Sequence, residues 1–204
     1  MARIVLFLGL LFSCLASMAW AKEPRTVLVF GDSLSAGYGI RIQQAWPTLL
    51  QQKLGQDWRV VNASMSGETT AGGLTRLPAA LKQHQPELLL LELGANDGLR
   101  GLPVETARQN LITMIELGRK AGARVGLIAV RMPPNFGPAY TTKFDAMFGD
   151  LARQYKLPPP PFLFEGIADK PELFQGDQLH PVATAQPRLL DNVWPLVQAL
   201  QLKH

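Results

Sequence analysis

Residues 26–37 read Thr-Val-Leu-Val-Phe-Gly-Asp-Ser-Leu-Ser-Ala-Gly, an apolar run that stops at Gly31 and leads into a small polar turn. Short apolar runs without polar alternation are typical of strands buried on both faces of a parallel sheet. Further runs lie at residues 58–62, 88–93 and 124–130, and a fifth is expected at residues 161–164 after a row of prolines. The sequence therefore predicts a sheet of up to five strands.

Segments with helical periodicity separate these runs. Pro103 suits the first turn of one helix, apolar side chains follow it at three- and four-residue steps, and Gly122 suits its end. A leucine stripe lies before the third run, and we expect Pro78 to break or restart that helix. Alternating strands and helices predict an α/β domain with helices on both faces of the sheet. Right-handed crossovers place the loops that follow the strands at one edge, where α/β proteins bind ligands.

The composition is that of a single globular domain. The chain has 204 residues, of which 47% are hydrophobic and 18% charged, so it is too apolar to be disordered. The formal net charge of +4 is not gathered into a run, so we expect no nucleic-acid partner.

The N-terminus has the pattern of a secretory signal peptide at residues 1–21. A short positive start leads into an apolar stretch, and Ala19-Trp20-Ala21 has the small-x-small form that is cleaved after Ala21. The stretch is shorter than the ~20 residues of a membrane span, so we expect a periplasmic or secreted protein rather than an anchored one. Lipidation at Cys14 is the disfavoured alternative, because the apolar run continues past Cys14. Residues 22–204 then form one domain without cysteine, which excludes a disulfide and a thiol nucleophile.

Small polar residues follow the strands in four loops, which are the sequence's main functional signal. These loops are residues 31–37, 62–69, 94–98 and 177–181. Any one of them fits an ordinary turn or helix cap, but the four together suit acyl transfer, in which a base activates a serine hydroxyl. Of the histidines after the signal peptide, His84 lies at a polar helix end and His204 is terminal. If Ser33 is a nucleophile, elimination leaves His180 as its base.

A base of this kind needs a group that orients it, and the reaction needs donors for the developing oxyanion. Asp177 is three residues before His180, a spacing at which its carboxylate can reach one imidazole nitrogen. Backbone N–H groups at Ser33 and Gly67 and the side-chain amide of Asn96 could supply the donors. Each feature has a plain structural alternative: a helix cap for His180, a solvated acid for Asp177 and a simple turn for Gly67.

Four ordered blocks resemble the signature blocks of the SGNH (GDSL) hydrolases. They are Gly31-Asp32-Ser33-Leu34-Ser35, Gly67, Gly94-Ala95-Asn96-Asp97 and Asp177-Gln178-Leu179-His180. Their extended contexts resemble the branch that includes bacterial periplasmic arylesterases and thioesterase I/lysophospholipase L1. Ala95 and Gln178 occupy slots where relatives often have glycine, and neither departure affects the motif residues.

This resemblance implies a three-layer α/β/α, flavodoxin-like fold with five parallel strands in the order 2-1-3-4-5. It implies that Ser33 is the nucleophile, His180 the base and Asp177 its orienting group, with an oxyanion hole of Ser33, Gly67 and Asn96. It also implies a serine esterase that needs no metal or cofactor. We expect a monomer that acts on a small-molecule ester or an acyl lipid. Its substrates would be aryl or short- and medium-chain acyl esters, with acyl thioesters and lysophospholipids as further candidates.

The apolar, proline-bounded segment 131–140 resembles a mobile substrate loop, and we expect Met132, Pro134, Phe136 and Tyr140 to cover an acyl chain. A packed surface loop is the alternative for this segment. Two other functions remain open: a carbohydrate or peptidoglycan O-deacetylase on the same fold, and a non-catalytic periplasmic binding protein. A nucleotide-binding module is disfavoured, because the first glycine turn has neither a phosphate-loop nor a dinucleotide pattern.

Overall fold

The computed structural model describes residues 23–202. The predicted signal peptide, its cleavage after Ala21, the alternative of lipidation at Cys14, and His204 lie outside the described residues. No helix within residues 23–202 is long and apolar enough to cross a membrane.

The core of the described chain is a parallel sheet in the order β2-β1-β3-β4. Its strands are β1 (Arg25–Gly31), β2 (Trp58–Asn62), β3 (Leu88–Glu92) and β4 (Arg124–Leu127). The two central strands, β1 and β3, are almost entirely buried, as their unbroken apolar runs predict. The predicted fold class and the order of the first four strands are confirmed.

The prediction of a fifth strand was wrong within the described residues. Residues 161–164 contribute only a single parallel bridge, between Phe162 and Ala129. The four prolines at 158–161 have no backbone N–H to donate, and the N–H of Glu165 bonds to Phe162 in a turn directly afterwards. The ladder therefore stops after two bonds, from the Ala129 N–H to Pro161 and from the Leu163 N–H to Ala129.

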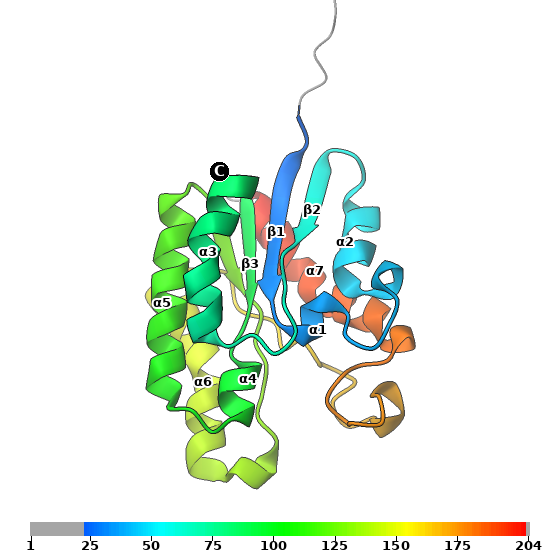
Figure 1. Cartoon of the computed structure of the whole chain (residues 1–204), viewed down its shortest axis with the longest axis vertical. Helices are drawn as coiled ribbons and strands as arrows, with labels where there is room; N and C mark the ends of the chain where they lie inside the picture. The colour runs from blue at the N-terminus through cyan, green and yellow to red at the C-terminus, as the bar shows by residue number, and fades with distance from the viewer. Residues whose placement is uncertain (1–22, 203–204) are drawn as a thin grey trace, which may run out of the picture.

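Helices cover both faces of the sheet, which gives the three layers seen in Figure 1. One face carries α3 (Thr70–His84), α5 (Val104–Lys120) and α6 (Pro138–Gln154), and the other carries α2 (Trp46–Leu54) and α7 (Gln186–Leu202). Two short helices, α1 (Ser33–Ala36) and α4 (Ala95–Leu99), begin directly after strands.

Helix α3 runs without a break through Pro78, so the expected break was wrong. Leu77 and Leu81 on either side are buried in the core, and this packing holds the helix together across the missing backbone donor. The limits expected for α5 are close to those observed: Pro103 is its N-cap residue, and Gly122 follows its end with a φ of +85°.

The parallel register brings three strand ends to one edge of the sheet. Gly31 at the end of β1 pairs with Glu92 at the end of β3, and Val29 pairs with Asn62 at the end of β2. The loops that follow these strands therefore meet, as the crossover rule predicts. We call this side of the molecule the carboxyl edge.

Candidate active site

Ser33 lies at the carboxyl edge, where β1 turns into α1. Asp32 is the buried N-cap of α1, and its carboxylate accepts a hydrogen bond from the Leu34 N–H at 3.0 Å. A left-handed Gly37 ends α1 after a single turn. The tight turn holds Ser33 in a nearly buried position at the base of a cavity.

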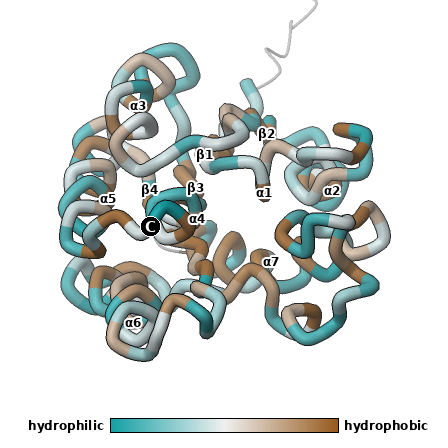
Figure 2. The backbone as a smooth tube through the Cα atoms, turned by 60° about the horizontal axis from the view of Figure 1, so that its bottom comes forward, coloured by the Kyte–Doolittle hydropathy of each residue, from teal (hydrophilic) through white to brown (hydrophobic). Residues whose placement is uncertain are grey.

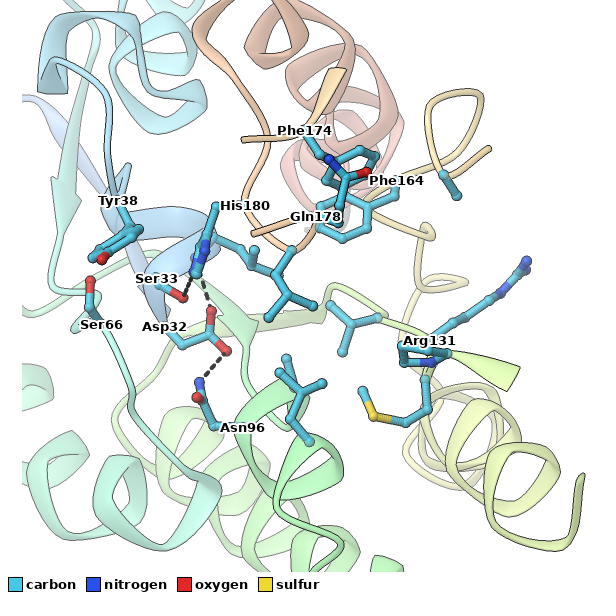
Figure 3. A pocket seen from close by; sticks show the side chains of 18 of the residues that line it. Asp32, Ser33, Tyr38, Ser66, Asn96, Arg131, Phe164, Phe174, Gln178 and His180 are labelled. Carbon is cyan, nitrogen blue, oxygen red and sulfur yellow. Dashed lines mark hydrogen bonds between the residues drawn. The ribbon is translucent and has the colours of Figure 1, made fainter. Parts of the chain in front are cut away.

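His180 and Asp177 meet Ser33 from a loop near the other end of the chain. His180 Nε2 lies 2.9 Å from Ser33 Oγ, across 147 residues of sequence. His180 Nδ1 lies 2.7 Å from Asp177 Oδ2. The structure therefore joins the three side chains in one hydrogen-bonded chain (Figure 3 draws the Ser33–His180 contact).

Asp177 is held as an ionised carboxylate. Its Oδ1 accepts hydrogen bonds from the backbone N–H groups of Leu179 and His180, at 2.9 and 3.0 Å. These two bonds, followed by the His180 side chain, lower the pKa of Asp177 to about 2. Asp177 therefore carries a negative charge beside His180 throughout the neutral pH range.

Two residues that the sequence did not single out support the imidazole. The ring of Tyr38 lies 4.5 Å from that of His180, centroid to centroid, and tilted by 42°. The backbone N–H of Gln175 donates a hydrogen bond to the His180 carbonyl at 2.7 Å. The side chain of Gln175 donates a second hydrogen bond to the Tyr38 carbonyl at 2.8 Å. Tyr38 lies in the extended context of the first block, but the sequence assigned it no role, and no motif marks Gln175. Their contact spans 137 residues, so no local pattern indicates it.

Asn96 and Gly67 border the same cavity as Ser33 and His180. The amide of Asn96, near the start of α4, donates one hydrogen bond to Asp32 Oδ2 at 3.1 Å (Figure 3), which leaves its second N–H available. Gly67 has a φ of +79°, a conformation that favours glycine, and there is open space where a Cβ would project. The structure thus brings together the residues that the sequence predicts for the oxyanion hole.

Two buried carboxyl groups lie behind the serine. Asp32 and Glu92 have no exposed surface, and burial raises the pKa of Asp32 to about 6 and that of Glu92 well above its ordinary value. Glu92 accepts from the Ser35 hydroxyl at 2.7 Å, while its Oε1 has no hydrogen-bond partner among the described residues. Any side chain at Gly31 would collide with Glu92. The carboxyl group of Glu92 therefore packs against the turn between β1 and α1 and stabilises it.

The cavity has a volume of about 590 Å³ and is lined mostly by apolar side chains. Met132 and Pro134 line it, as predicted for the substrate loop, and Phe136 and Tyr140 do not. The hydroxyl of Tyr140 instead donates to the Leu102 carbonyl at 2.7 Å, and its ring stacks on Phe144.

Three aromatic residues that the sequence analysis did not select line the cavity. Phe162, Phe164 and Phe174 are among its lining residues, and the rings of Phe164 and Phe174 meet edge to face at 5.4 Å. Figure 3 shows these two rings far from Ser33, beyond His180. The cavity thus offers a polar end at Ser33 and an aromatic end suited to an apolar group.

The described part of the chain contains no group of three or more His, Cys, Asp or Glu side chains that could hold a metal ion. The polar end of the cavity offers a serine, a histidine and amide donors. Independence from a metal or cofactor stays a prediction.

A three-layer α/β fold that brings a serine, a histidine and an aspartate together at the carboxyl edge of its sheet is an arrangement found in hydrolytic enzymes. A family model described as "GDSL-like Lipase/Acylhydrolase family" matches residues 29–186. The chain belongs to this family.

Curated relatives align along most of the chain. Esterase TesA from Pseudomonas aeruginosa is 46% identical over 94% of this chain and 98% of its own length. An arylesterase from Vibrio mimicus is 46% identical over 90% of this chain and 92% of its own. The thioesterase 1/protease 1/lysophospholipase L1 of Escherichia coli is 45% identical over 84% and 82%.

Solved structures confirm the fold class. A crystal structure of TesA superposes with a TM-score of 0.81 at 46% identity, covering 86% of this chain and 99% of that chain. The psychrotrophic esterase EstA from Pseudoalteromonas sp. gives a TM-score of 0.83 at 38% identity, covering 88% and 100%.

Proposed function

We propose that this protein is a serine esterase that hydrolyses carboxylic esters through an acyl-enzyme intermediate. The observation that carries the proposal is the continuous hydrogen-bonded chain from Ser33 Oγ through His180 to Asp177. The relatives named as an esterase, an arylesterase and a thioesterase/lysophospholipase support the same class of reaction.

In the proposed reaction, Ser33 Oγ attacks the ester carbonyl carbon while His180 Nε2 takes the hydroxyl proton. The carbonyl oxygen becomes an oxyanion that accepts hydrogen bonds from the amides of Ser33, Gly67 and Asn96. The proton then passes from His180 to the leaving alkoxide or phenolate, which departs as the alcohol. Water, deprotonated by His180, attacks the acyl-Ser33 ester, and collapse of the second tetrahedral intermediate releases the acid and restores the serine hydroxyl.

Asp177 would stabilise the imidazolium that forms in each step. Its low pKa keeps it ionised, and its bond to Nδ1 fixes the tautomer in which Nε2 faces Ser33. Asp177 thus acts by orienting the base.

The substrate class follows from the cavity and from the names of the relatives. An apolar lining with aromatic rings at its far end suits aryl and short- or medium-chain acyl groups. Acyl thioesters and lysophospholipids are further substrates within the proposal, because one relative is named for both activities. We further propose that the chain acts as a monomer in the periplasm or outside the cell after cleavage following Ala21, as its N-terminal pattern suggests.

The test is hydrolysis of p-nitrophenyl esters with two to sixteen acyl carbons by the chain from residue 22 onwards. We expect turnover that peaks at one chain length and disappears in Ser33→Ala. A fluorophosphonate should label the parent protein but not Ser33→Ala. Ser66→Ala is the control, because Ser66 is another serine that lines the cavity, and this variant should still be labelled. A folded protein that shows neither turnover nor label would overturn the proposal.

A further inference from the structure

Exposed apolar side chains gather at the carboxyl edge, which also carries the cavity. Among the described residues, seven large hydrophobic side chains are exposed: Tyr38, Ile42, Met65, Leu99, Leu102, Leu179 and Leu202. All except Leu202 belong to loops or short helices of the carboxyl edge. Tyr38, Leu99 and Leu179 line the cavity itself. Single exposed apolar residues are ordinary, but a group of them at one edge is typical of an interaction site.

The topology explains why these side chains share one side of the molecule. Tyr38 and Ile42 follow β1, Met65 follows β2, and Leu99 and Leu102 follow β3, and these three strands are parallel. Figure 2 turns this edge forward and shows hydrophobic stretches at α1 and α4. We call the six residues the apolar rim.

Three exposed arginines lie beside the apolar rim or the cavity. Arg41 is the exposed neighbour of Ile42, and Arg100 lies exposed between Leu99 and Leu102. Arg131, also exposed, lines the cavity. The acids nearest in sequence to rim residues are each held by a partner: Asp97 is buried and accepts from Thr70, and Asp177 is bound to His180. Glu105, three residues after Leu102, pairs with Arg108. Apolar side chains interspersed with arginine are the combination that binds anionic lipid surfaces.

We propose that the apolar rim binds the surface of an anionic phospholipid bilayer, so that the cavity mouth opens onto the lipid. Three residues of the rim line the cavity itself, so whatever covers the rim during turnover must also supply the substrate. A lipid surface meets this condition, whereas a second protein chain seated there would close the cavity. The role in substrate supply rests on the proposed esterase function, while binding to the bilayer does not.

Two physical terms contribute to this binding. The exposed aliphatic side chains leave water for the boundary between headgroups and acyl chains, as amphipathic surface segments do. The arginines gain from the negative surface potential, an attraction that salt weakens over a Debye length. Binding should therefore require anionic lipid and decrease with ionic strength.

The experiment measures binding of Ser33→Ala, which cannot hydrolyse lipid, to vesicles by co-sedimentation. We expect binding to vesicles of phosphatidylglycerol mixed with phosphatidylcholine, and much weaker binding to phosphatidylcholine alone. Adding Ile42→Ser and Met65→Ser, which lie outside the cavity lining, should lower the partition coefficient about tenfold, since each removes apolar surface from the contact.

The matched control is Leu202→Ser in the same background. Leu202 is the most exposed of the seven side chains at 79%, and it lies at the opposite edge, because the neighbouring Gln201 carbonyl accepts from Arg124 at the start of β4. This control should bind vesicles as strongly as Ser33→Ala. Equal losses in Leu202→Ser and the rim variant, or no binding to anionic vesicles, would overturn the proposal. A dimer in solution that only the rim substitutions dissociate would also overturn it.

A separate assay distinguishes this proposal from the proposed function. With Ser33 intact, Ile42→Ser/Met65→Ser should hydrolyse a monomeric short-chain p-nitrophenyl ester at the parent rate, which also shows that the variant folds. If the parent protein binds anionic vesicles but hydrolyses no ester, the esterase function fails and the lipid-binding surface stands. If it hydrolyses esters but binds no vesicles, the lipid-binding surface fails alone.

Discussion

Gln175 donates a hydrogen bond from its side-chain Nε2 to the backbone carbonyl of Tyr38 at 2.8 Å, and so joins the loop that carries His180 to the loop that follows Ser33. The side chain packs directly over Gly39, where an added Cβ would lie 2.0 Å from Gln175 Oε1. We infer that Gln175 is a positioning residue that maintains the spacing between the serine and the imidazole.

Gln175→Ala should lower kcat roughly tenfold to a hundredfold and leave KM for a short ester nearly unchanged, because misplacement of a catalytic group costs rate more than binding. Gln175→Glu should lose as much, since a carboxylate cannot donate to Tyr38. Steady-state kinetics would test both, with Gln154→Ala on α6 as a control that leaves kcat intact. A large rise in KM at constant kcat would refute the positioning role.

Removal of the base should cost more than removal of the group that orients it. We expect His180→Ala to lower kcat by about 10⁶-fold and Asp177→Ala by about 10⁴-fold, the sizes measured for such residues in a serine protease. Asp177 is 38% exposed, so water can take the place of its carboxylate at Nδ1. Single-turnover kinetics with a p-nitrophenyl ester would give both rates, and equal losses would contradict this ranking.

Asn96→Ala should raise the activation barrier by about 2.7–4 kcal/mol, which is the range for one oxyanion donor. Asn96 already bonds to Asp32, so its amide is held in place before the oxyanion forms. The measurement is kcat for a short ester. Asn110→Ala is the matched control, because that amide bonds to Thr70 outside the cavity lining and should retain full turnover. An unchanged kcat in Asn96→Ala would remove Asn96 from the oxyanion hole.

Stability should decrease as pH rises from 5 to 8, in part because of Glu92. Burial raises the pKa of Glu92 well above its ordinary value of 4.5, so the unfolded chain releases this proton at lower pH than the folded protein does. The unfolded state then binds fewer protons, and the free energy of unfolding decreases with increasing pH, by about 1.4 kcal/mol per pH unit at most for one group.

Glu92→Gln should reduce this dependence, because the amide stays neutral at both pH values. Urea unfolding at pH 5 and pH 8 would measure the effect. Glu105→Gln serves as the control, since Glu105 is on the surface and its side chain is 77% exposed. An identical pH dependence in the parent protein and in Glu92→Gln would show that Glu92 titrates normally.

Phe174→Ala should move the preference for chain length towards longer acyl groups. Its ring lines the cavity on the side away from Ser33 (Figure 3), and each methylene that enters the vacated space would gain about 0.8 kcal/mol, or roughly fourfold in kcat/KM. The series of p-nitrophenyl esters would show the shift. Phe136→Ala, outside the cavity lining, should keep the parent optimum, and an unmoved optimum in Phe174→Ala would place the acyl group elsewhere.

The sequence predicted the parts of this structure that local chemistry determines. Gly31 and the apolar run before it indicate β1 and its turn, and the shortage of histidines directs attention to His180. Phe164 and Phe174 were missed because an apolar residue carries no sign of whether it faces a core or a cavity. Tyr140 was assigned to the cavity, but its ring stacks on Phe144, a contact that no spacing rule indicates.

The fifth strand shows the same limit in the backbone. The apolar residues at 162–164 resemble a strand, but their proline neighbours cannot extend the ladder beyond the single bridge to Ala129. Propensity for a strand and availability of hydrogen-bond partners are separate conditions, and only the first can be read directly from composition.

The separation of Ser33 and His180 by 147 residues has a consequence for biogenesis. The serine leaves the ribosome well before the imidazole, because the chain is synthesised from its N-terminus. An incomplete or unfolded polypeptide holds a serine without its base, so the chain should stay inert until the loop that carries His180 has been made and has docked. On refolding, hydrolysis should return only when the loop that carries His180 docks beside Ser33, so enzymatic activity would report the formation of this contact.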